Sequence, residues 1–496
     1  MASFGAFLRL VGVGWTLVRN DALLPRELDG FYSPAVRGLA NTLRVFAARR
    51  DGRPGQRLAR ALQGLGPVAI KLGQFLSTRA DIFGRTFAED MGHLKDKLPP
   101  FPLQEARAAI AAELGRRVDD LFPTLGEPVA AASLAQAHEA TFVDGRRVAV
   151  KVLRPGIDRR VAADAAVLAL AARLMARWAA PLRRLEPVRF ADTVIRATEL
   201  ELDLRLEAAG ADELAEVMAK DGYMAAPKVV WPGVGKRVLT MEWAQGLPLS
   251  DAAALEQPGL DRKTLADNLT RAFLAQALDH GVFHADLHEG NLFCAAPAKI
   301  YAVDFGIIGR LGAPERRYLA EILWGFLNRD YSRVAQVHFD AGYVPAHHSV
   351  EAFAQALRAV GEPVFGRQAD AVAMSRVLTQ LFEITALYDM HLRPELVLLQ
   401  KTMVTVEGVA RSIDTEHNIW AAAEPVVRRW IARELSPVTR VREFAGEAER
   451  AIRNIARMSE PQPVVVQPAE PASRLLWFAL GAMASGAAFL AGMLLG

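Results

Sequence analysis

The stretch HADLHEGN at residues 284–291 constrains the fold of this chain more than any other part of the sequence. His284, Asp286 and His288 alternate along it, and Asn291 follows, so the stretch has two chemical interpretations. The alternating side chains could be ligands in a metal-dependent hydrolase, where histidines and carboxylates hold the metal ion. Alternatively, the stretch could be the catalytic loop of a phosphotransferase, in which Asp286 faces an acceptor and Asn291 holds Mg²⁺.

The residues on either side of this loop favour the phosphotransferase. Asp286 and Asn291 have the D-x₄-N spacing of a kinase-like catalytic loop, and Asp304 begins a DFG triplet thirteen residues after Asn291. Lys151 lies well upstream in the β-rich run VAVKV, so the four residues occur in the kinase order. A hydrolase would need more ligands at other strand ends, and the ten histidines supply no second ligand pair. The pattern therefore predicts a site for Mg²⁺ and nucleotide phosphates.

The composition is that of a mostly globular chain with balanced charge. Its 496 residues suffice for two or three structural units with a buried core. The net charge is +3, and no basic stripe with interleaved aromatic residues is present, which argues against a nucleic-acid partner. Cys294 is the single cysteine, so neither an internal disulfide nor a CxxC zinc motif can form. A reducing, cytoplasmic location suits the globular part.

Local patterns separate helical from β-containing segments. Residues 20–120 predict helices between Gly and Pro breaks, and the helical run 105–114 ends at Gly115. Asp144-Gly145 separates two β-rich runs and predicts a hairpin. The remaining predictions are β structure at 137–143, 146–153 and 228–244, two short strands around 294–306, and helices at 161–180, at 188–220 and over most of the chain after 260.

Both ends of the chain are apolar. Residues 474–496 carry one charge, on Arg474, ahead of an uncharged stretch that at ~1.5 Å per residue matches about one hydrocarbon core. This predicts a transmembrane helix behind the proline-rich linker 459–473, with the body on the cytoplasmic side of the basic flank. The N-terminal segment 4–18 predicts either an interfacial helix anchored by Trp15 or a helix docked on the body.

The segment upstream of Lys151 departs from the kinase pattern. A glycine-rich loop is expected there, because glycine lets backbone N–H groups approach phosphates closely. Residues 129–140, VAAASLAQAHEA, contain no glycine. Alanines favour a stiffer, partly helical loop. We therefore expect nucleotide to be bound or turned over differently from an ordinary protein kinase.

Taken together, these motifs resemble the UbiB family of atypical kinase-like proteins over about residues 60–440. The similar segments are KLGQ (71–74), AAASLAQAH, VAVKVLRPG, ELDLRLEA (201–208), GVFHADLHEGNLF, DFGIIGRL and LVLLQKTMVTVEGVARSI (396–413). The resemblance implies an α+β, bilobal protein-kinase-like fold with a C-terminal transmembrane helix. The implied parts are a helical N-terminal extension over 1–120, an N-lobe over 121–245 and a C-lobe over 246–458.

The resemblance also implies roles for single residues. Lys151 would contact the α- and β-phosphates of ATP and pair with Glu201, while Lys71 and Gln74 would lie across the entrance for a protein substrate. The implied sets are catalytic residues Asp286, Lys151 and Glu201, cofactor-binding residues Ala130, Ala131, Ala132, Ser133, Lys151 and Glu242, Mg²⁺-binding residues Asn291, Asp304 and Asp203, and regulatory residues Lys71 and Gln74.

At the level of function, the resemblance implies a membrane-anchored ATPase or small-molecule kinase that uses ATP and Mg²⁺ in ubiquinone biosynthesis at the bacterial inner membrane. The implied partners are membrane lipid, prenylphenol intermediates of ubiquinone and other ubiquinone biosynthesis proteins, and a homodimer is allowed. A nucleotide-sensing scaffold without chemistry is the main alternative. A true protein kinase is a third, disfavoured by the KxGQ segment and the missing glycines.

Overall fold

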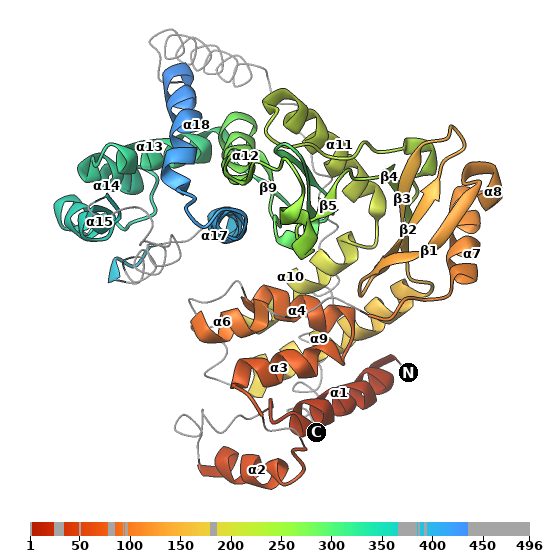
Figure 1. Cartoon of the computed structure of the whole chain (residues 1–496). Helices are drawn as coiled ribbons and strands as arrows, with labels where there is room; N and C mark the ends of the chain where they lie inside the picture. The colour runs from red at the N-terminus through yellow and green to blue at the C-terminus, as the bar shows by residue number, and fades with distance from the viewer. Residues whose placement is uncertain are drawn as a thin grey trace, which may run out of the picture. The chain divides into compact units, whose positions relative to one another are not determined.

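The computed structural model describes residues 2–434 with breaks at 24–33, 49–50, 78–84, 93, 95–97, 179–185, 366–383, 385–386 and 391–393. Met1–Ala432 form one compact unit, and its elements are labelled in Figure 1. Within the described residues, no helix is both long enough and apolar enough to cross a membrane. The predicted linker and transmembrane helix over 459–496 lie outside the described residues.

A four-stranded antiparallel sheet in the order β1-β2-β3-β4 forms the first β-containing part (Figure 1). Gly145 has φ +86° in the predicted hairpin between β2 and β3, a backbone conformation that suits glycine. Val148, Val150 and Val152 alternate inward along β3 and are fully buried beside Phe122. The strands are β1 (Thr124–Ala131), β2 (Ala135–Thr141), β3 (Arg147–Leu153) and β4 (Val238–Glu242).

The alanine-rich segment forms a strand and a turn, so the prediction of a partly helical loop was wrong. Ala130 and Ala131 belong to β1 and pair with β2. The backbone N–H of Ala132 then donates to the carbonyl oxygen of Ala135 at 2.8 Å, which closes the turn. Alanine's helix propensity is a weak local preference, and the hydrogen bonds of the β1–β2 ladder outweigh it.

Helices follow and flank this sheet. The helix α7 (Leu103–Leu114) packs on β1, β3 and β4 and ends at Gly115, whose φ of +64° gives the predicted C-cap. Asp203 lies between α10 and α11 and caps the N-terminus of α11. The other helices of this part are α8 (Val118–Leu121), α9 (Ile157–Trp178), α10 (Pro187–Leu200) and α11 (Leu204–Asp221), with a short 3₁₀ turn at Trp231–Gly233.

The N-terminal extension is helical in its described residues. The KLGQ segment lies in α4, which packs on α3, α6, α9 and α10. Gly73 is buried inside this segment, and a Cβ atom there would clash with Cδ1 of Leu94. A larger residue at position 73 would therefore require the Leu94 side chain to move. The helices are α1 (Ala2–Arg19), α2 (Pro34–Arg44), α3 (Pro54–Gln63), α4 (Pro67–Ser77) and α6 (Arg85–Gly92).

The remaining part is mainly helical, as predicted, with short strands among the helices. The predicted pair of strands is present as the hairpin β7 (Leu292–Ala295) and β8 (Lys299–Ala302). The strands β5 (Leu247–Pro248), β6 (Val282–His284) and β9 (Ile308–Arg310) were missed, because two or three residues carry no readable period. The helices are α12 (Arg262–Ala275), α13 (Ala313–Leu327), α14 (Tyr331–Asp340), α15 (Val350–Phe365), α17 (Pro394–Ile413) and α18 (Ile419–Glu434), with 3₁₀ turns at Ala252–Glu256 and Glu289–Asn291 and a π-helical turn at Gln276–His280.

The core of this part supports the loop that follows β6. Leu265, Leu269 and Phe273 on α12 are fully buried and belong to the largest apolar cluster. The ring of Phe273 meets that of Phe283 in β6 edge-to-face, with centroids 5.7 Å apart. The strand that leads into HADLHEGN is therefore fixed by the α12 core.

Gly246 lies in the chain between β4 and β5, and we expect Gly246→Ala to destabilise the fold strongly. Its φ is +91°, and a Cβ atom there would clash with the carbonyl oxygen of Cys294, a backbone atom that cannot rotate away. Gly145 has a similar φ of +86° but no atom within 4 Å of a Cβ, so Gly145→Ala is a matched control. Urea unfolding should show that Gly246→Ala lowers the free energy of unfolding by about 3 kcal/mol, and Gly145→Ala by about 1 kcal/mol. Equal losses would mean that the clash is relieved by movement of the backbone.

Candidate functional site

His284 holds the loop 284–291 in place from inside the protein. It is fully buried, and its Nδ1 accepts a hydrogen bond from the backbone N–H of Asp286 at 3.1 Å. Its Nε2 donates to the carbonyl oxygen of Val303 at 3.2 Å, and burial lowers its pKa, which favours the neutral ring. Both ring nitrogens are engaged by backbone groups, so His284 braces the loop and has no nitrogen left for a metal ion.

Asn291 is oriented by the same loop. Its side-chain Nδ2 donates to the carbonyl oxygen of Asp286 at 3.1 Å, and its backbone carbonyl oxygen accepts from the backbone N–H of Val303 at 2.9 Å. Because the amide nitrogen faces Asp286, the amide oxygen of this nearly buried side chain is directed elsewhere. An oriented amide oxygen is a suitable ligand for Mg²⁺.

Asp304 occupies a strained backbone position beside this loop. Its φ is +61°, in the left-handed region that few residues other than glycine adopt, and such strain often accompanies functional sites. Phe305 is buried and its ring lies 5.2 Å from that of His284, which fixes the DFG triplet in the core. The ammonium of Lys151 lies 3.2 Å from the Asp304 carboxylate and lowers the pKa of Asp304 to about 2, so this carboxylate is ionised at neutral pH.

Lys151 pairs with Glu207, and the predicted partner Glu201 was wrong. The Lys151 Nζ lies 2.7 Å from Oε1 and 2.9 Å from Oε2 of Glu207, which is in the first turn of α11. Glu201 is the C-cap of α10, on the other side of the break at Asp203. Burial raises the pKa of Glu207 to about 7, while the Lys151 charge opposes that shift. Lys151 is thus held between the carboxylates of Glu207 and Asp304.

Glu201 instead forms an ion pair with Lys71 of the KLGQ segment. Both side chains are largely buried, and burial raises the pKa of Glu201 against the lowering effect of Lys71. The charges of Asp304 and Lys151 also act on Glu201, so this pair adjoins the lysine–aspartate pair. Gln74 lies half-buried one helical turn after Lys71 in α4. The extension therefore reaches the site through α4, whereas the regulatory roles of Lys71 and Gln74 stay predictions.

Asp203 is held by its own neighbours. Its Oδ1 accepts from the backbone N–H of Arg205 at 3.2 Å and caps α11. The Arg205 guanidinium donates to both carboxylate oxygens, at 2.8 Å and 2.6 Å, and lowers the pKa of Asp203. The observed role of Asp203 is that of a helix cap, and its role as a metal ligand stays a prediction.

The predicted cofactor-binding residues lie at two places along the four-stranded sheet. The Ala130–Ala132 segment and the buried Ser133 form the end of β1 and the turn into β2. Arg154 donates to the carbonyl oxygen of Ala132 at 2.8 Å and 2.9 Å, which fixes the turn. Glu242 ends β4, and its carboxylate accepts from Arg146 at 3.0 Å. That carboxylate is engaged with the β2–β3 hairpin, so nucleotide binding by these residues stays a prediction.

Three contributors to the site were missed from the sequence. Glu207 is one. The other two are Lys401 and Thr402 in α17: the Lys401 Nζ lies 3.9 Å from Oδ1 of Asp286, and the Thr402 hydroxyl lies 3.1 Å from the carbonyl oxygen of Ala285. The only available signal was their place in the segment 396–413, which gives no indication of contact with the loop.

Asp286 has a cationic or titratable group near each carboxylate oxygen. Lys401 approaches Oδ1, and the Nε2 of His288 lies 3.6 Å from Oδ2. All three side chains remain partly exposed, so a ligand could reach them. Asp286, Asn291, Lys151 and Asp304 thus lie in one connected region, and its charges suit a phosphate chain with a bound cation.

A sheet that carries a paired lysine, followed by a helical part with a braced Asp–Asn loop and a DFG triplet, defines a protein-kinase-like fold. Residues 93–338 match the ABC1 atypical kinase-like domain, and residues 357–418 match the UbiB helical domain. The chain belongs to the UbiB family of atypical kinase-like proteins. This family assignment confirms the resemblance found in the motifs.

Individual relatives cover most of the chain. The protein of Marinobacter nauticus described as "Probable protein kinase UbiB" is 38% identical over 388 residues, which are 77% of this chain and 71% of the relative. The protein of the same description from Azotobacter vinelandii is 38% identical over 463 residues, 92% of this chain and 86% of the relative. Among solved structures, the Rv3197–erythromycin complex from Mycobacterium tuberculosis has a TM-score of 0.51 at 25% identity and covers 74% of this chain and 93% of that one.

Proposed function

We propose that the protein is a membrane-anchored, Mg·ATP-dependent ATPase that acts on lipophilic prenylphenol intermediates in ubiquinone biosynthesis. The observation that carries the proposal is the double pairing of Lys151 with Glu207 and Asp304 beside the Asp286–Asn291 loop. A lysine held between two carboxylates is extended and ready to meet phosphate oxygens. The substrate class rests on membership of the UbiB family, and family members of this kind support ubiquinone biosynthesis.

The residues present suit Mg²⁺. Asp304 is ionised and half-exposed, and the Asn291 amide nitrogen is bonded to the carbonyl oxygen of Asp286, which leaves the amide oxygen to act as a ligand. Hard oxygen ligands of this kind are those that Mg²⁺ prefers, so Asp304 and Asn291 would hold the ion. When bound, Mg²⁺ would neutralise charge on the nucleotide phosphates.

The protein's own side chains orient the phosphate chain and the attacking group. Lys151 orients the phosphate chain and Glu207 keeps its side chain extended. Asp286 orients the attacking group, water or a substrate hydroxyl, and accepts its hydrogen bond. Lys401 and His288 place positive or titratable groups beside Asp286, within the region where charge builds up during phosphoryl transfer. The catalytic loop has no lysine of its own between Asp286 and Asn291, so α17 supplies the nearby cation.

The Lys71–Glu201 pair supports a small acceptor over a protein substrate. It joins the N-terminal extension to the C-cap of α10 next to Lys151, and both partners are largely buried. The turn after β1 also has no glycine for close approach of backbone N–H groups to phosphates.

The turn without glycine favours one alternative, because it suits low turnover. That alternative is a nucleotide-sensing scaffold that organises the biosynthetic proteins.

The proposed location is the bacterial inner membrane, with the kinase-like body in the cytoplasm. It is supported by the uncharged apolar run within residues 474–496 and by Arg474 before it. A homodimer is compatible with this arrangement.

Asp286→Asn separates catalysis from scaffolding. In a strain that lacks this protein, we expect neither Asp286→Asn nor Lys151→Met to restore ubiquinone, because both turnover and phosphate binding are needed. Quinone profiling of lipid extracts measures the result, with immunoblots of membrane fractions to show equal amounts of protein. Restoration by Asp286→Asn but not by Lys151→Met would favour the scaffold. Restoration by both would refute a nucleotide-dependent role.

A further inference from the structure

One face of α1 presents large apolar side chains to solvent. Phe7, Leu8, Val11 and Trp15 lie on one side of the helix by their spacing, and each is about half-exposed, from 49% for Trp15 to 56% for Leu8 and Val11. The helix is already docked on α9, where Arg9 approaches Asp164 at 3.9 Å. Docking on the body therefore leaves this face uncovered among the described residues.

The end of α2 extends the same surface. Val45 is 75% exposed and Phe46 53%, and the ring centroids of Phe46 and Trp15 are 5.6 Å apart. The Ala48 backbone N–H donates to the carbonyl oxygen of Arg19 at 3.0 Å, which ties the segment after α2 to the end of α1. We call these six side chains the N-terminal apolar face: Phe7, Leu8, Val11, Trp15, Val45 and Phe46.

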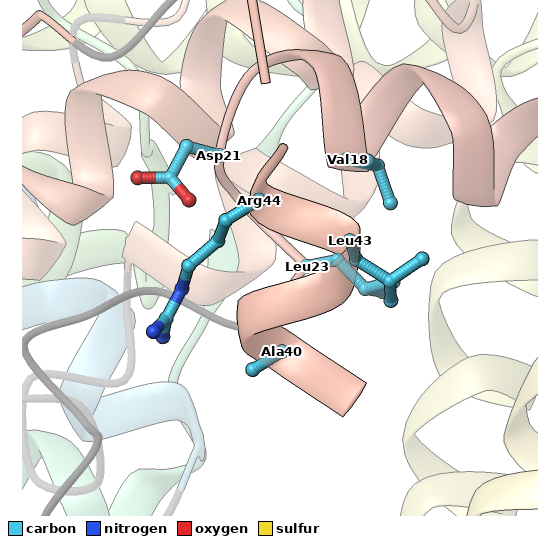
Figure 2. Close-up of a pocket in the computed structure, with 6 residues that line it drawn as sticks. All are labelled: Val18, Asp21, Leu23, Ala40, Leu43 and Arg44. Atoms are coloured by element: carbon cyan, nitrogen blue, oxygen red, sulfur yellow. The ribbon is translucent and has the colours of Figure 1, made fainter. Parts of the chain in front are cut away.

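A small pocket lies between α1 and α2 (Figure 2). Its lining brings Val18 and Leu23 together with Leu43, and Asp21 lies on the same side as Arg44. The Arg57 Nε donates to the carbonyl oxygen of Asp21 at 3.1 Å, and both side chains are buried. The two helices thus meet through their own apolar residues, and Arg57 of α3 anchors the end of α1, while the N-terminal apolar face stays outside.

Arginines outnumber exposed carboxylates on the two segments that carry the face. In residues 2–23 and 34–48 the only carboxylate is Asp21, which is 6% exposed and close to Arg57. The same two segments carry the exposed Arg9, Arg19 and Arg37, with Arg9 close to Asp164, whereas Arg44 is buried. An apolar face with arginines and without exposed carboxylates suits a surface that is apolar inside and anionic at its edge.

We propose that the N-terminal apolar face binds the surface of an anionic lipid bilayer. The apolar side chains would enter the boundary between headgroups and acyl chains, with Trp15 at the polar level, and the exposed Arg9 and Arg19 would meet lipid phosphates. A second copy of this chain would bring arginine-rich edges against each other in a two-fold interface. The apolar segment of residues 474–496 has no acidic residue for these arginines. The contact is separate from the proposed C-terminal anchor and from ATP chemistry.

The single cysteine makes a site-specific test practical. Cys294 is fully buried, so an introduced surface cysteine can be labelled selectively with an environment-sensitive fluorophore in the full-length protein. Val11→Cys places the label on the face, and Val143→Cys, at a residue 59% exposed against 56% for Val11, is the matched control. With vesicles of phosphatidylcholine and phosphatidylglycerol, we expect a blue shift at position 11 and its quenching by spin-labelled lipids, with neither change at position 143.

Lipid composition and a charge variant complete the test. Quenching at position 11 should be weaker on pure phosphatidylcholine. The Arg19→Gln substitution should lower the affinity for anionic vesicles, measured by this quenching, about fivefold, and should leave the affinity for pure phosphatidylcholine unchanged. An aqueous environment at position 11 on anionic vesicles would refute the proposal. So would a blue shift without lipid quenching. If that shift grew with protein concentration, a second copy would be the occupant, and if it did not, the chain's own apolar segment would be.

Discussion

Asp304→Asn should lower Mg²⁺-dependent ATP turnover by at least about a hundredfold while leaving the fold intact. The substitution keeps the shape of the side chain but removes a charge that is present at neutral pH, because Lys151 holds the pKa of Asp304 at about 2. It therefore removes both the anionic metal ligand and one of the two carboxylates that position Lys151. The measurement is the rate of Mg·ATP hydrolysis with vesicles and a prenylphenol mimic, together with the unfolding midpoint of each protein.

Asp203→Asn is the matched control for this result. Asp203 caps α11 and pairs with Arg205, and asparagine is an equally good N-cap, so turnover should change little. A large loss of ATP turnover in both variants would indicate that Asp203 binds Mg²⁺, as the resemblance implied. Unchanged turnover in Asp304→Asn would remove the metal role from Asp304.

The residues that were correctly predicted to lie together are close in the sequence or are joined by a single hairpin. Asp286 and Asn291 are on one loop, and Asp304 returns to it through the β7–β8 hairpin, so their proximity follows from local structure. The Asp-Gly hairpin and the helix end at Gly115 were also readable, because glycine at positive φ leaves a local signal.

The glutamate partners of Lys151 and Lys71 could not be predicted from the sequence. Glu201 and Glu207 are six residues apart in one acidic segment, and the segment alone does not say which of them reaches Lys151. The choice depends on the helix break at Asp203, which leaves Glu201 at the end of α10 and puts Glu207 on α11. Lys71 then meets Glu201 because α4 packs on α10, a contact between distant segments.

Long-range packing also explains the other errors. The alanine-rich segment has helical propensity, but its partner is β2, and strand pairing is decided by the register of the whole sheet. Lys401 and Thr402 come to the Asp286 loop because α17 packs along α12, more than a hundred residues away in the chain. Contacts of this kind leave no pattern within a single segment.

Glu207→Gln should lower kcat/KM for Mg·ATP by about ten- to a hundredfold, because an uncharged side chain cannot hold Lys151 as an ion pair. The same pairing predicts a pH dependence. Burial raises the pKa of Glu207 to about 7, so the carboxylate becomes protonated and releases Lys151 as the pH falls through about 7. The kcat/KM of the unmodified protein should therefore fall on the acid side of neutrality, since kcat/KM reports the groups of the free enzyme.

Comparison with Glu201→Gln decides which glutamate positions the lysine. Glu207→Gln has no carboxylate to titrate, so its low kcat/KM should lose the decline near pH 7. Glu201→Gln breaks the pair with Lys71 but leaves both oxygens of Glu207 on Lys151, so the decline should remain. If Glu201→Gln abolished the decline and Glu207→Gln kept it, Lys151 would pair with Glu201 during turnover, and the Lys151–Glu207 pair would belong to a different state of the site.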